Sequence, residues 1–248
     1  MLLRAPGFSA LHVANLRHGF TTREGGVSEG SFASLNVSAK RGDDPARVEE
    51  NLCRIADEGD FSRERLRRVR QVHGCSVLRA STIEPESEAD AIWTHIDDGP
   101  CIVSVTTADC VPILLTDVGG RVAAAVHSGW RGTVANIVGA TVETLLAQGV
   151  RPSELRAAIG PCIYLPAFEV GEEVAEHFNP RYVAREGYAN PHVDLPRLVR
   201  DQLLEAGLDA DAVEVVGACT HRHPERFFSY RRDGASTGQA LSFVGFAD

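Results

Sequence analysis

The stretch of sequence that decides the fold is residues 101–138, CIVSVTTADCVPILLTDVGGRVAAAVHSGWRGTVANIV. Three short apolar runs, rich in β-branched residues, predict buried strands at residues 101–107, 111–115 and 121–126. Gly119 and Gly120 mark the turn between the last two of them. Cys110 and His127 are therefore expected at strand ends, where a thiol and an imidazole can bind a metal or attack a substrate.

A helix is expected soon after His127. The chain continues Ser-Gly-Trp-Arg-Gly, and a helical pattern then runs from Thr133 to a stop at Gly149. The apolar residues on one face of that helix are Val134, Ile137, Val138, Val142 and Leu145. Arg131 would lie beside the free N–H groups of the helix start, where the dipole also favours an anion. This segment is therefore a candidate phosphate site.

The remaining elements alternate irregularly between helix and strand. Strands or apolar runs are expected at residues 11–20, 69–78, 91–93, 155–163, 213–218 and 240–246, and helices at residues 45–59, 170–178 and 195–207. The strand at 69–78 is broken at Gly74, which places His73 beside a bulge or a strand end. Such an irregular order predicts an α+β fold, a single layered domain over residues 1–248 with mixed sheets flanked by helices.

Composition excludes several classes of protein. The chain has 248 residues, 44% of them hydrophobic, enough to bury a large core. No apolar stretch is long enough for a membrane span and no export signal is recognisable, so we expect a cytoplasmic protein without membrane contacts. The six cysteines form no CxxC pair and are expected to be reduced. A net charge of -9 argues against nucleic-acid binding, and the one basic cluster, residues 63–70, is interpreted as a solvated segment.

Three residues carry the chemistry that the pattern itself indicates. His73, Cys110 and His127 supply two imidazoles and a thiolate, which are good zinc ligands and leave a fourth position open, as a catalytic zinc site requires. Their spacing is too wide to be diagnostic. The residues alone leave three interpretations open: a zinc site, a nucleophile and base pair formed by Cys110 and His127, or a buried cysteine with two structural histidines.

A series of motifs resembles the YfiH family from end to end. The motifs are TRxGGVS at residues 22–28, SLN at 34–36, QVHG at 71–74, TADC at 107–110, HSGWRG at 127–132, GPC at 160–162 and FFSYRRDG at 227–234. This family carries the names polyphenol oxidase and laccase and includes the peptidoglycan editing factor and FAMIN-type proteins. The resemblance implies a layered α+β fold similar to cytotoxic necrotizing factor catalytic domains. It also implies His73, Cys110 and His127 as the ligands of one zinc ion per chain.

The resemblance implies a purine nucleoside phosphorylase, in which phosphate attacks the ribose C1′ and the base departs. Adenosine deamination and action on methylthioadenosine are implied for the same pocket. Cys110, His127 and Asp109 are expected to be catalytic, Asp109 by protonating or hydrogen-bonding the purine, although a turn residue at the strand crossing is the alternative for it. Substrate-binding roles are expected for Arg131, Arg23, Asn36 and Arg231. The expected partners are a purine nucleoside and phosphate, and the chain is expected to be a monomer or a homodimer.

Two other classes of function stay open. One is a cysteine hydrolase or amidase in peptidoglycan precursor editing, with Cys110 as nucleophile and His127 as base, and the other is a non-catalytic binding module. Copper laccase activity is not expected, because only nine histidines are present and they form a single HxH pair, His221 and His223. That pair is interpreted as structural, with a place at the pocket rim as the alternative. Cys162 is also interpreted as structural, with a second nucleophile as the alternative.

One position departs from the family pattern. The resemblance leads us to expect TGR near the end of the chain, whereas this sequence has Thr237-Gly238-Gln239. If that arginine holds an anionic group in the family, its role here would pass to Arg231 or Arg232 or be lost.

Overall fold

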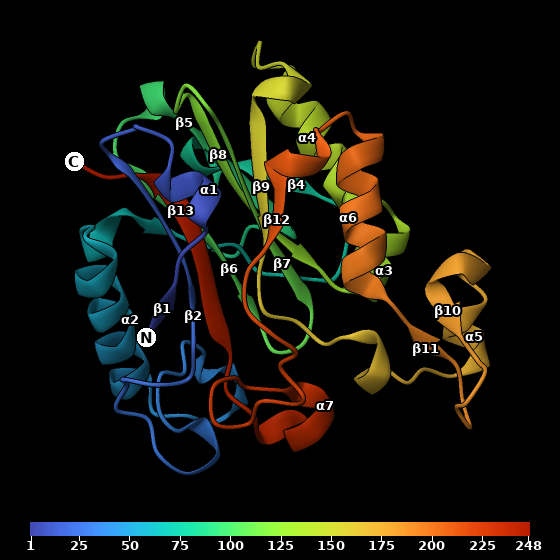
Figure 1. Ribbon diagram of the computed structural model, residues 1–248. Coiled ribbons are helices and arrows are strands. Elements are labelled where there is room, and N and C mark those ends of the chain that lie inside the picture. The colour runs from blue at the N-terminus through green and yellow to red at the C-terminus, as the bar shows by residue number, and fades with distance from the viewer.

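The computed structural model describes residues 1–248 and has four layers, with two β-sheets packed face to face between helices (Figure 1). The five-stranded sheet has the order β1 (Leu2–Leu3), β2 (Leu16–Thr21), β13 (Ala240–Phe246), β6 (Cys101–Thr107) and β3 (Leu66–Arg67). The six-stranded sheet has the order β12 (Val213–Val215), β9 (Leu155–Ile159), β7 (Val111–Asp117), β8 (Val122–Ser128), β5 (Ala91–His95) and β4 (Val77–Arg79). Both sheets mix parallel and antiparallel pairs, so the predicted α+β class is confirmed.

Helices cover the outer face of each sheet (Figure 1). The helices are α1 (Pro6–Ser9), α2 (Pro45–Gly59), α3 (Trp130–Val134), α4 (Ile137–Leu146), α5 (Glu172–Ala175), α6 (Leu195–Glu205) and α7 (Tyr230–Asp233). Helix α2 packs on the five-stranded sheet, and α4 and α6 pack on the six-stranded sheet. A small ribbon of β10 (Val183–Ala184) and β11 (His192–Val193) lies beside α5 at the periphery. No helix has the length and apolar character needed to cross a membrane.

The apolar runs of the deciding stretch are strands buried on both faces. In β8, Val122, Ala124 and Val126 join the core under α4 and α6. The alternate residues Ala123 and Ala125 join the core between the two sheets. A strand covered on both sides needs apolar residues at every position, which explains why these runs show no polar alternation. The predictions for β6, β7 and β8 are confirmed.

The helix predicted from Thr133 onward is wrong in its start and its continuity. Helix α3 begins at Trp130, with Gly129 as its N-cap, and it ends after five residues. Asn136 then adopts a left-handed backbone with φ of 59°, and its side-chain oxygen accepts the N–H of Gly139 to start α4. Asparagine tolerates this conformation because its side chain bonds to the nearby backbone. The break exposes Val134, which the sequence pattern had placed on the apolar face.

The other predicted elements differ in how well their lengths were predicted. The helix at 45–59 is confirmed, and the Asp44 carboxylate caps it by accepting the Ala46 N–H at 2.8 Å. The first strand begins only at Leu16, and only four residues of the segment 170–178 are helical. The strand predicted at 69–78, with a break at Gly74, is present only from Val77 as β4, and the residues before it form a loop in which His73 has a φ of 61°. The reason lies in a buried carboxylate, Asp90, described below.

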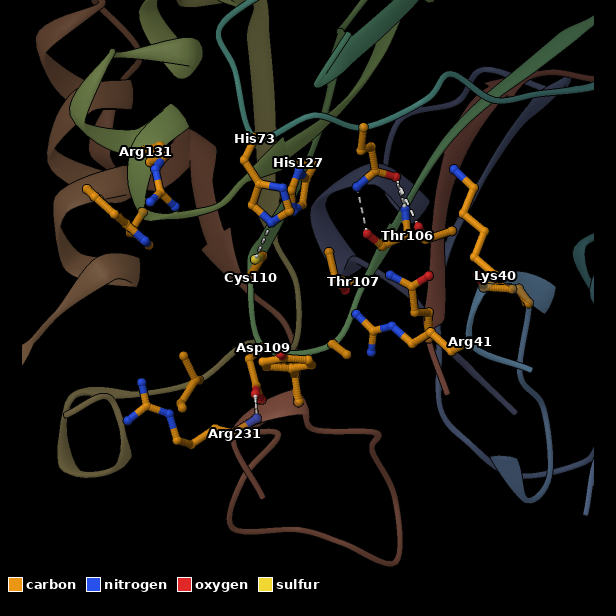
Figure 2. Close-up of a pocket in the computed structure, with 18 of the residues that line it drawn as sticks. Lys40, Arg41, His73, Thr106, Thr107, Asp109, Cys110, His127, Arg131 and Arg231 are labelled. Carbon is orange, nitrogen blue, oxygen red and sulfur yellow. Dashed lines mark hydrogen bonds between the residues drawn. The ribbon is translucent and has the colours of Figure 1, made fainter. Parts of the chain in front are cut away.

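The segment between β6 and β7 carries the chain from one sheet to the other. Strand β6 belongs to the five-stranded sheet, whereas β7, three residues later, belongs to the six-stranded sheet. Asp109 lies in this crossing with a φ of 93°, and Cys110 follows it. The residues of this crossing line the cavity in which the candidate site lies (Figure 2).

Candidate active site

A cavity of about 590 Å³ lies at the crossing between the two sheets. Its lining includes His73, Cys110 and His127, together with the five cations Lys40, Arg41, Arg68, Arg131 and Arg231. The volume falls in the range of small-molecule sites. Figure 2 shows the two histidines and the cysteine pointing into the middle of this space, with labelled cations on either side of them.

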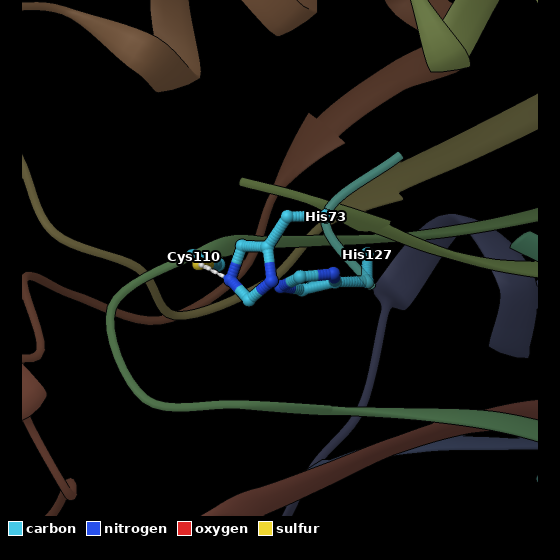
Figure 3. Close-up of side chains that lie close together, drawn as sticks. All are labelled: His73, Cys110 and His127. Atoms are coloured by element: carbon cyan, nitrogen blue, oxygen red, sulfur yellow. Dashed lines mark hydrogen bonds between the residues drawn. The ribbon is translucent and has the colours of Figure 1, made fainter. Parts of the chain in front are cut away.

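The structure brings the three predicted metal ligands together. Their ligand atoms all lie within 4.8 Å of one another, and His73 Nε2 is 4.0 Å from Cys110 Sγ. The two imidazole rings meet edge to face, with centroids 4.8 Å apart (Figure 3). Cys110 precedes β7, His127 lies near the end of β8, and His73 lies in the loop before β4. Two imidazoles and one thiolate converging this closely form a donor set that fits a metal ion.

Asp90 holds two of these three residues in place, and sequence reasoning missed it. Its carboxylate lies 2.7 Å from His127 Nδ1 and is fully buried. The same carboxylate accepts the backbone N–H groups of Val72, His73 and Gly74 at 3.2, 3.0 and 2.6 Å. The contact leaves Nε2 of His127 as its ligand atom, and metal-binding histidines commonly donate their other nitrogen to a carboxylate in this way.

Asp90 also explains why the strand predicted at 69–78 begins only at β4. Three consecutive N–H groups turn toward one carboxylate instead of toward a neighbouring strand, so the loop at 72–74 replaces a ladder. Burial would raise the pKa of Asp90, but the bonds from His127 and from these N–H groups lower it overall. The acidic segment 83–90 offered no signal that would separate Asp90 from its exposed neighbours.

A glycine closes the space around the triad of His73, Cys110 and His127. A Cβ on Gly129 would lie 2.8 Å from His73 Cδ2 and 3.3 Å from Cys110 Sγ. The first distance is shorter than side-chain contacts allow, so any larger residue here would push the histidine away. The HSGWRG motif therefore needs glycine at this position for packing.

The triad favours a charged pair in the absence of metal. Burial alone would raise the pKa of the Cys110 thiol, but the charge and hydrogen bonds of the neighbouring imidazoles lower it to about 6. Burial likewise opposes the imidazolium of His127, but Cys110 and Asp90 raise its pKa to about 9. A thiolate at neutral pH is the form that both metal binding and nucleophilic attack require.

Both carboxylate oxygens of Asp109 accept hydrogen bonds from the protein. It accepts hydrogen bonds from Thr220 Oγ1 at 2.6 Å, from Ser229 Oγ at 3.0 Å and from the backbone N–H of Arg231 at 2.6 Å. These contacts tie the crossing before Cys110 to segments more than a hundred residues later. The geometry matches the turn-residue alternative for Asp109 more closely than contact with a substrate.

The predicted substrate-binding residues separate into two groups. Arg131 and Arg231 line the cavity, where their guanidinium groups stack on Trp130 and Phe168 with centroid distances of 4.1 and 5.5 Å. Arg23 and Asn36 are not among the lining residues.

Arg23 and Asn36 instead hold the N-terminal loop. Arg23 donates to the carbonyls of Ala33 and Pro224 at 2.7 and 2.9 Å. Asn36 is fully buried, and its amide bonds to the Ser38 backbone, the Asp43 carboxylate and the Gln239 N–H. Their polar atoms are thus committed to the fold.

Three further lining cations, Lys40, Arg41 and Arg68, were not expected from the sequence. Arg68 belongs to the basic cluster interpreted as solvated, and only the fold shows that this one member faces the cavity. Gln239 also lines the cavity, on the side of these cations. Cys162, His221 and His223 do not line it, and Cys162 is buried in an isolated bridge with Cys219.

The two packed sheets, with a candidate metal-binding triad where the chain crosses between them, are characteristic of one protein family. The family model described as multi-copper polyphenol oxidoreductase laccase matches residues 17–247. The chain therefore belongs to this laccase-like family, which includes the YfiH and YlmD proteins.

Individual relatives cover nearly the whole chain. A protein of Deinococcus radiodurans named purine nucleoside phosphorylase is 39% identical over 98% of this chain and 95% of its own length. Purine nucleoside phosphorylase YfiH of Escherichia coli is 36% identical over 90% of this chain and 91% of its own. The crystal structure of YlmD from Geobacillus stearothermophilus superposes with a TM-score of 0.86 at 31% identity, covering 98% and 94% of the two chains. The resemblance to the YfiH family is confirmed.

Proposed function

We propose that this protein is a zinc-dependent purine nucleoside phosphorylase that also deaminates adenosine and acts on methylthioadenosine. The observation that carries the proposal is the triad of His73, Cys110 and His127 in a cavity whose walls hold unpaired arginines. The relatives named purine nucleoside phosphorylase supply the substrate class. The three triad residues would hold the zinc ion.

The metal would act as a Lewis acid with an open coordination position, the property that both nucleoside cleavage and deamination can use. The chain's own residues set the conditions for it. Asp90 fixes the ring of His127 by a 2.7 Å contact, so the ligand atom needs no reorganisation. Gly129 leaves His73 and Cys110 the room to approach each other.

Arg131 supplies the positive charge for the attacking phosphate in this proposal. Its guanidinium packs on the Trp130 ring and forms no ion pair with any carboxylate, so its N–H groups are available to an anion. Arginine recognises phosphate oxygens through two parallel hydrogen bonds. Arg231, stacked on Phe168, lines the same cavity.

The proposal favours zinc over copper because of the donor set. A single cluster of two imidazoles and one thiolate suits zinc, whereas a multicopper oxidase needs a copper cluster built mainly from histidines. The protein purified without added metal should carry about one zinc per chain by elemental analysis. Copper in excess of zinc would contradict the proposal.

The activity is tested with a panel of nucleosides, including inosine, adenosine and methylthioadenosine, each with and without phosphate. Chromatography would detect free base and ribose 1-phosphate from phosphorolysis, and inosine from deamination of adenosine. Base release that requires phosphate supports the proposal. Absence of base release from every nucleoside in zinc-loaded protein would overturn it.

A cysteine hydrolase remains the second candidate, because Cys110, His127 and Asp90 form a chain of nucleophile, base and orienting carboxylate. The two candidates differ in what zinc does. A thiolate bound to zinc is protected from alkylation, whereas a catalytic nucleophile is alkylated and loses activity with or without zinc. Full activity in metal-free protein, with a covalent adduct on Cys110, would favour the hydrolase.

A further inference from the structure

One end of the cavity carries cations that the proposed phosphorolysis does not use. This cationic end consists of Lys40, Arg41 and Arg68. Lys40 and Arg41 belong to a short 3-10 turn at Ala39–Arg41, and Arg68 follows β3. In Figure 2, Lys40 and Arg41 lie on one side of the triad and Arg131 lies on the other.

Hydrogen bonds to the backbone hold two of these cations near the segment that precedes β13. Arg68 donates to the Val37 carbonyl at 2.9 Å, and the Val37 N–H in turn donates to the Gln239 carbonyl at 3.2 Å. Arg41 lies within 3.4 Å of the Thr237 carbonyl, and its guanidinium stands 5.1 Å from the centre of the Tyr230 ring. The cationic end is thus a built part of the cavity wall.

No carboxylate neutralises this end. Neither Lys40, Arg41 nor Arg68 takes part in an ion pair, although most of the chain's ion pairs use arginine. Among all the residues that line the cavity, Asp109 is the single carboxylate, and three donors already occupy it. In a protein of net charge -9, a cavity wall with uncompensated positive charge attracts an anionic ligand.

Figure 2 shows the triad between Arg131 on one side and Lys40 and Arg41 on the other, so these cations offer an anion a place separate from Arg131. We propose that Lys40, Arg41 and Arg68 form a second phosphoryl-binding subsite, which takes a phosphoryl group carried by the substrate itself. Nucleoside monophosphates would then bind in the same cavity as nucleosides. This inference rests on the proposed function for the nucleoside part of the ligand.

Lys40 makes the subsite directly observable, because it is the only lysine in the chain. An amine-directed acylating reagent can modify only Lys40 and the N-terminal amine, and mass spectrometry of the two peptides separates them. Inosine 5′-monophosphate should slow acylation of Lys40 about tenfold while leaving the N-terminal amine unaffected. Inosine alone should protect Lys40 far less.

A double variant, Lys40→Ala with Arg41→Ala, tests the same subsite by calorimetry. The ratio of the affinities for inosine 5′-monophosphate and inosine should fall about tenfold or more, since each charge-assisted hydrogen bond to phosphate contributes strongly. The matched control, Arg54→Ala with Arg200→Ala, removes two positive charges from α2 and α6, outside the cavity, and should leave this ratio unchanged. Should the double variant fail to fold, acylation of the native protein still decides.

The outcomes separate the two proposals. The subsite is overturned if Lys40 is acylated equally with and without the monophosphate and the double variant keeps the native affinity ratio. This holds even if the protein cleaves inosine. Protection by inorganic phosphate alone, with none added by the monophosphate, makes this end a site for the free ion and overturns the substrate-borne group. Protection by the monophosphate without any nucleoside cleavage keeps the subsite and removes the phosphorylase.

Discussion

The two functional walls of the cavity are built in opposite ways. The triad wall of His73, Cys110 and His127 is fixed by the buried Asp90, whose carboxylate reaches both histidine segments. The cationic end of Lys40, Arg41 and Arg68 holds long side chains with no carboxylate partner. A buried carboxylate holds the first wall in place, whereas the cations of the second wall have no carboxylate partner and keep their charge available for a ligand.

This difference indicates two kinds of recognition. A metal centre depends on the distances between its ligands. The groups that hydrogen-bond to those ligands must therefore hold them rigidly. An anion subsite acts through positive charge and adaptable hydrogen bonds, so flexible side chains suffice. Changes in the triad wall should therefore cause steep losses that conservative replacements do not rescue, while changes among the cavity arginines should cause graded, salt-dependent losses.

The largest effect is expected from removing a triad ligand. Cys110→Ser replaces a thiolate by a neutral hydroxyl, and His73→Ala removes an imidazole, so both variants should lose zinc and about a hundredfold or more of the phosphorolysis rate. Zinc content and rate are measured together on protein shown to be folded by circular dichroism. If His73→Ala retained activity while Cys110→Ser lost it, the triad would not act as a metal site, and a nucleophilic cysteine would be favoured.

The next effect concerns pH in the metal-free protein. Because the pKa of Cys110 is lowered to about 6, its thiolate fraction at pH 7 should be roughly 90%, against about 1% for an ordinary thiol. Alkylation of Cys110 should therefore rise with pH around a midpoint near 6. Cys75 offers an internal control, since burial and the charge of Asp90 raise its pKa. A midpoint near 9 for Cys110 would contradict the charged pair.

Asp90→Asn should weaken zinc binding about 10- to 100-fold, because the amide loses the charge that orients His127. Titration with a competing chelator measures the affinity. Asp117→Asn is the matched control, since Asp117 is also fully buried and accepts backbone N–H groups, but it lies away from the cavity. Equal zinc affinity in the two variants would show that Asp90 supports only the fold.

The smallest effect is expected at Arg131, because its side chain is exposed to water. Arg131→Ala should raise the phosphate concentration for half-maximal rate about tenfold and leave zinc content unchanged. Raising the ionic strength should weaken phosphate binding in the native protein but have less effect in the variant. Arg197→Ala removes an arginine that stacks on Tyr182 outside the cavity and serves as control. An unchanged phosphate dependence would remove Arg131 from the site.

The sequence predicted the strands around the triad because they are buried on both faces, and such strands carry an unbroken apolar pattern. It also placed Cys110 and His127 at strand ends. It could not predict the loop at residues 72–74, since that loop depends on a carboxylate, Asp90, from another segment. The helix break at Asn136 likewise depends on one side-chain bond that overrides a periodic pattern.

The cationic end shows a second limit of the sequence. Arg68 is one of several arginines in residues 63–70, and its neighbours Arg63 and Arg65 form surface ion pairs. Nothing local distinguishes the member that faces the cavity, because the packing of β3 against β6 decides it. Arg23 and Asn36 illustrate the opposite case. Both lie in motifs that were expected to bind substrate, but their side chains hold the loop that carries Lys40 and do not line the cavity.

The position of β13 has a consequence for how the protein is made. This strand, residues 240–246, lies between β2 and β6, so the middle of the five-stranded sheet cannot pair until residues 240–246 have left the ribosome. The Asp109 carboxylate likewise waits for Ser229 and Arg231. Contacts of such long sequence separation form slowly. The crossing that carries Cys110 therefore gains the contacts of Asp109 with Ser229 and Arg231 only after residue 231 has been made.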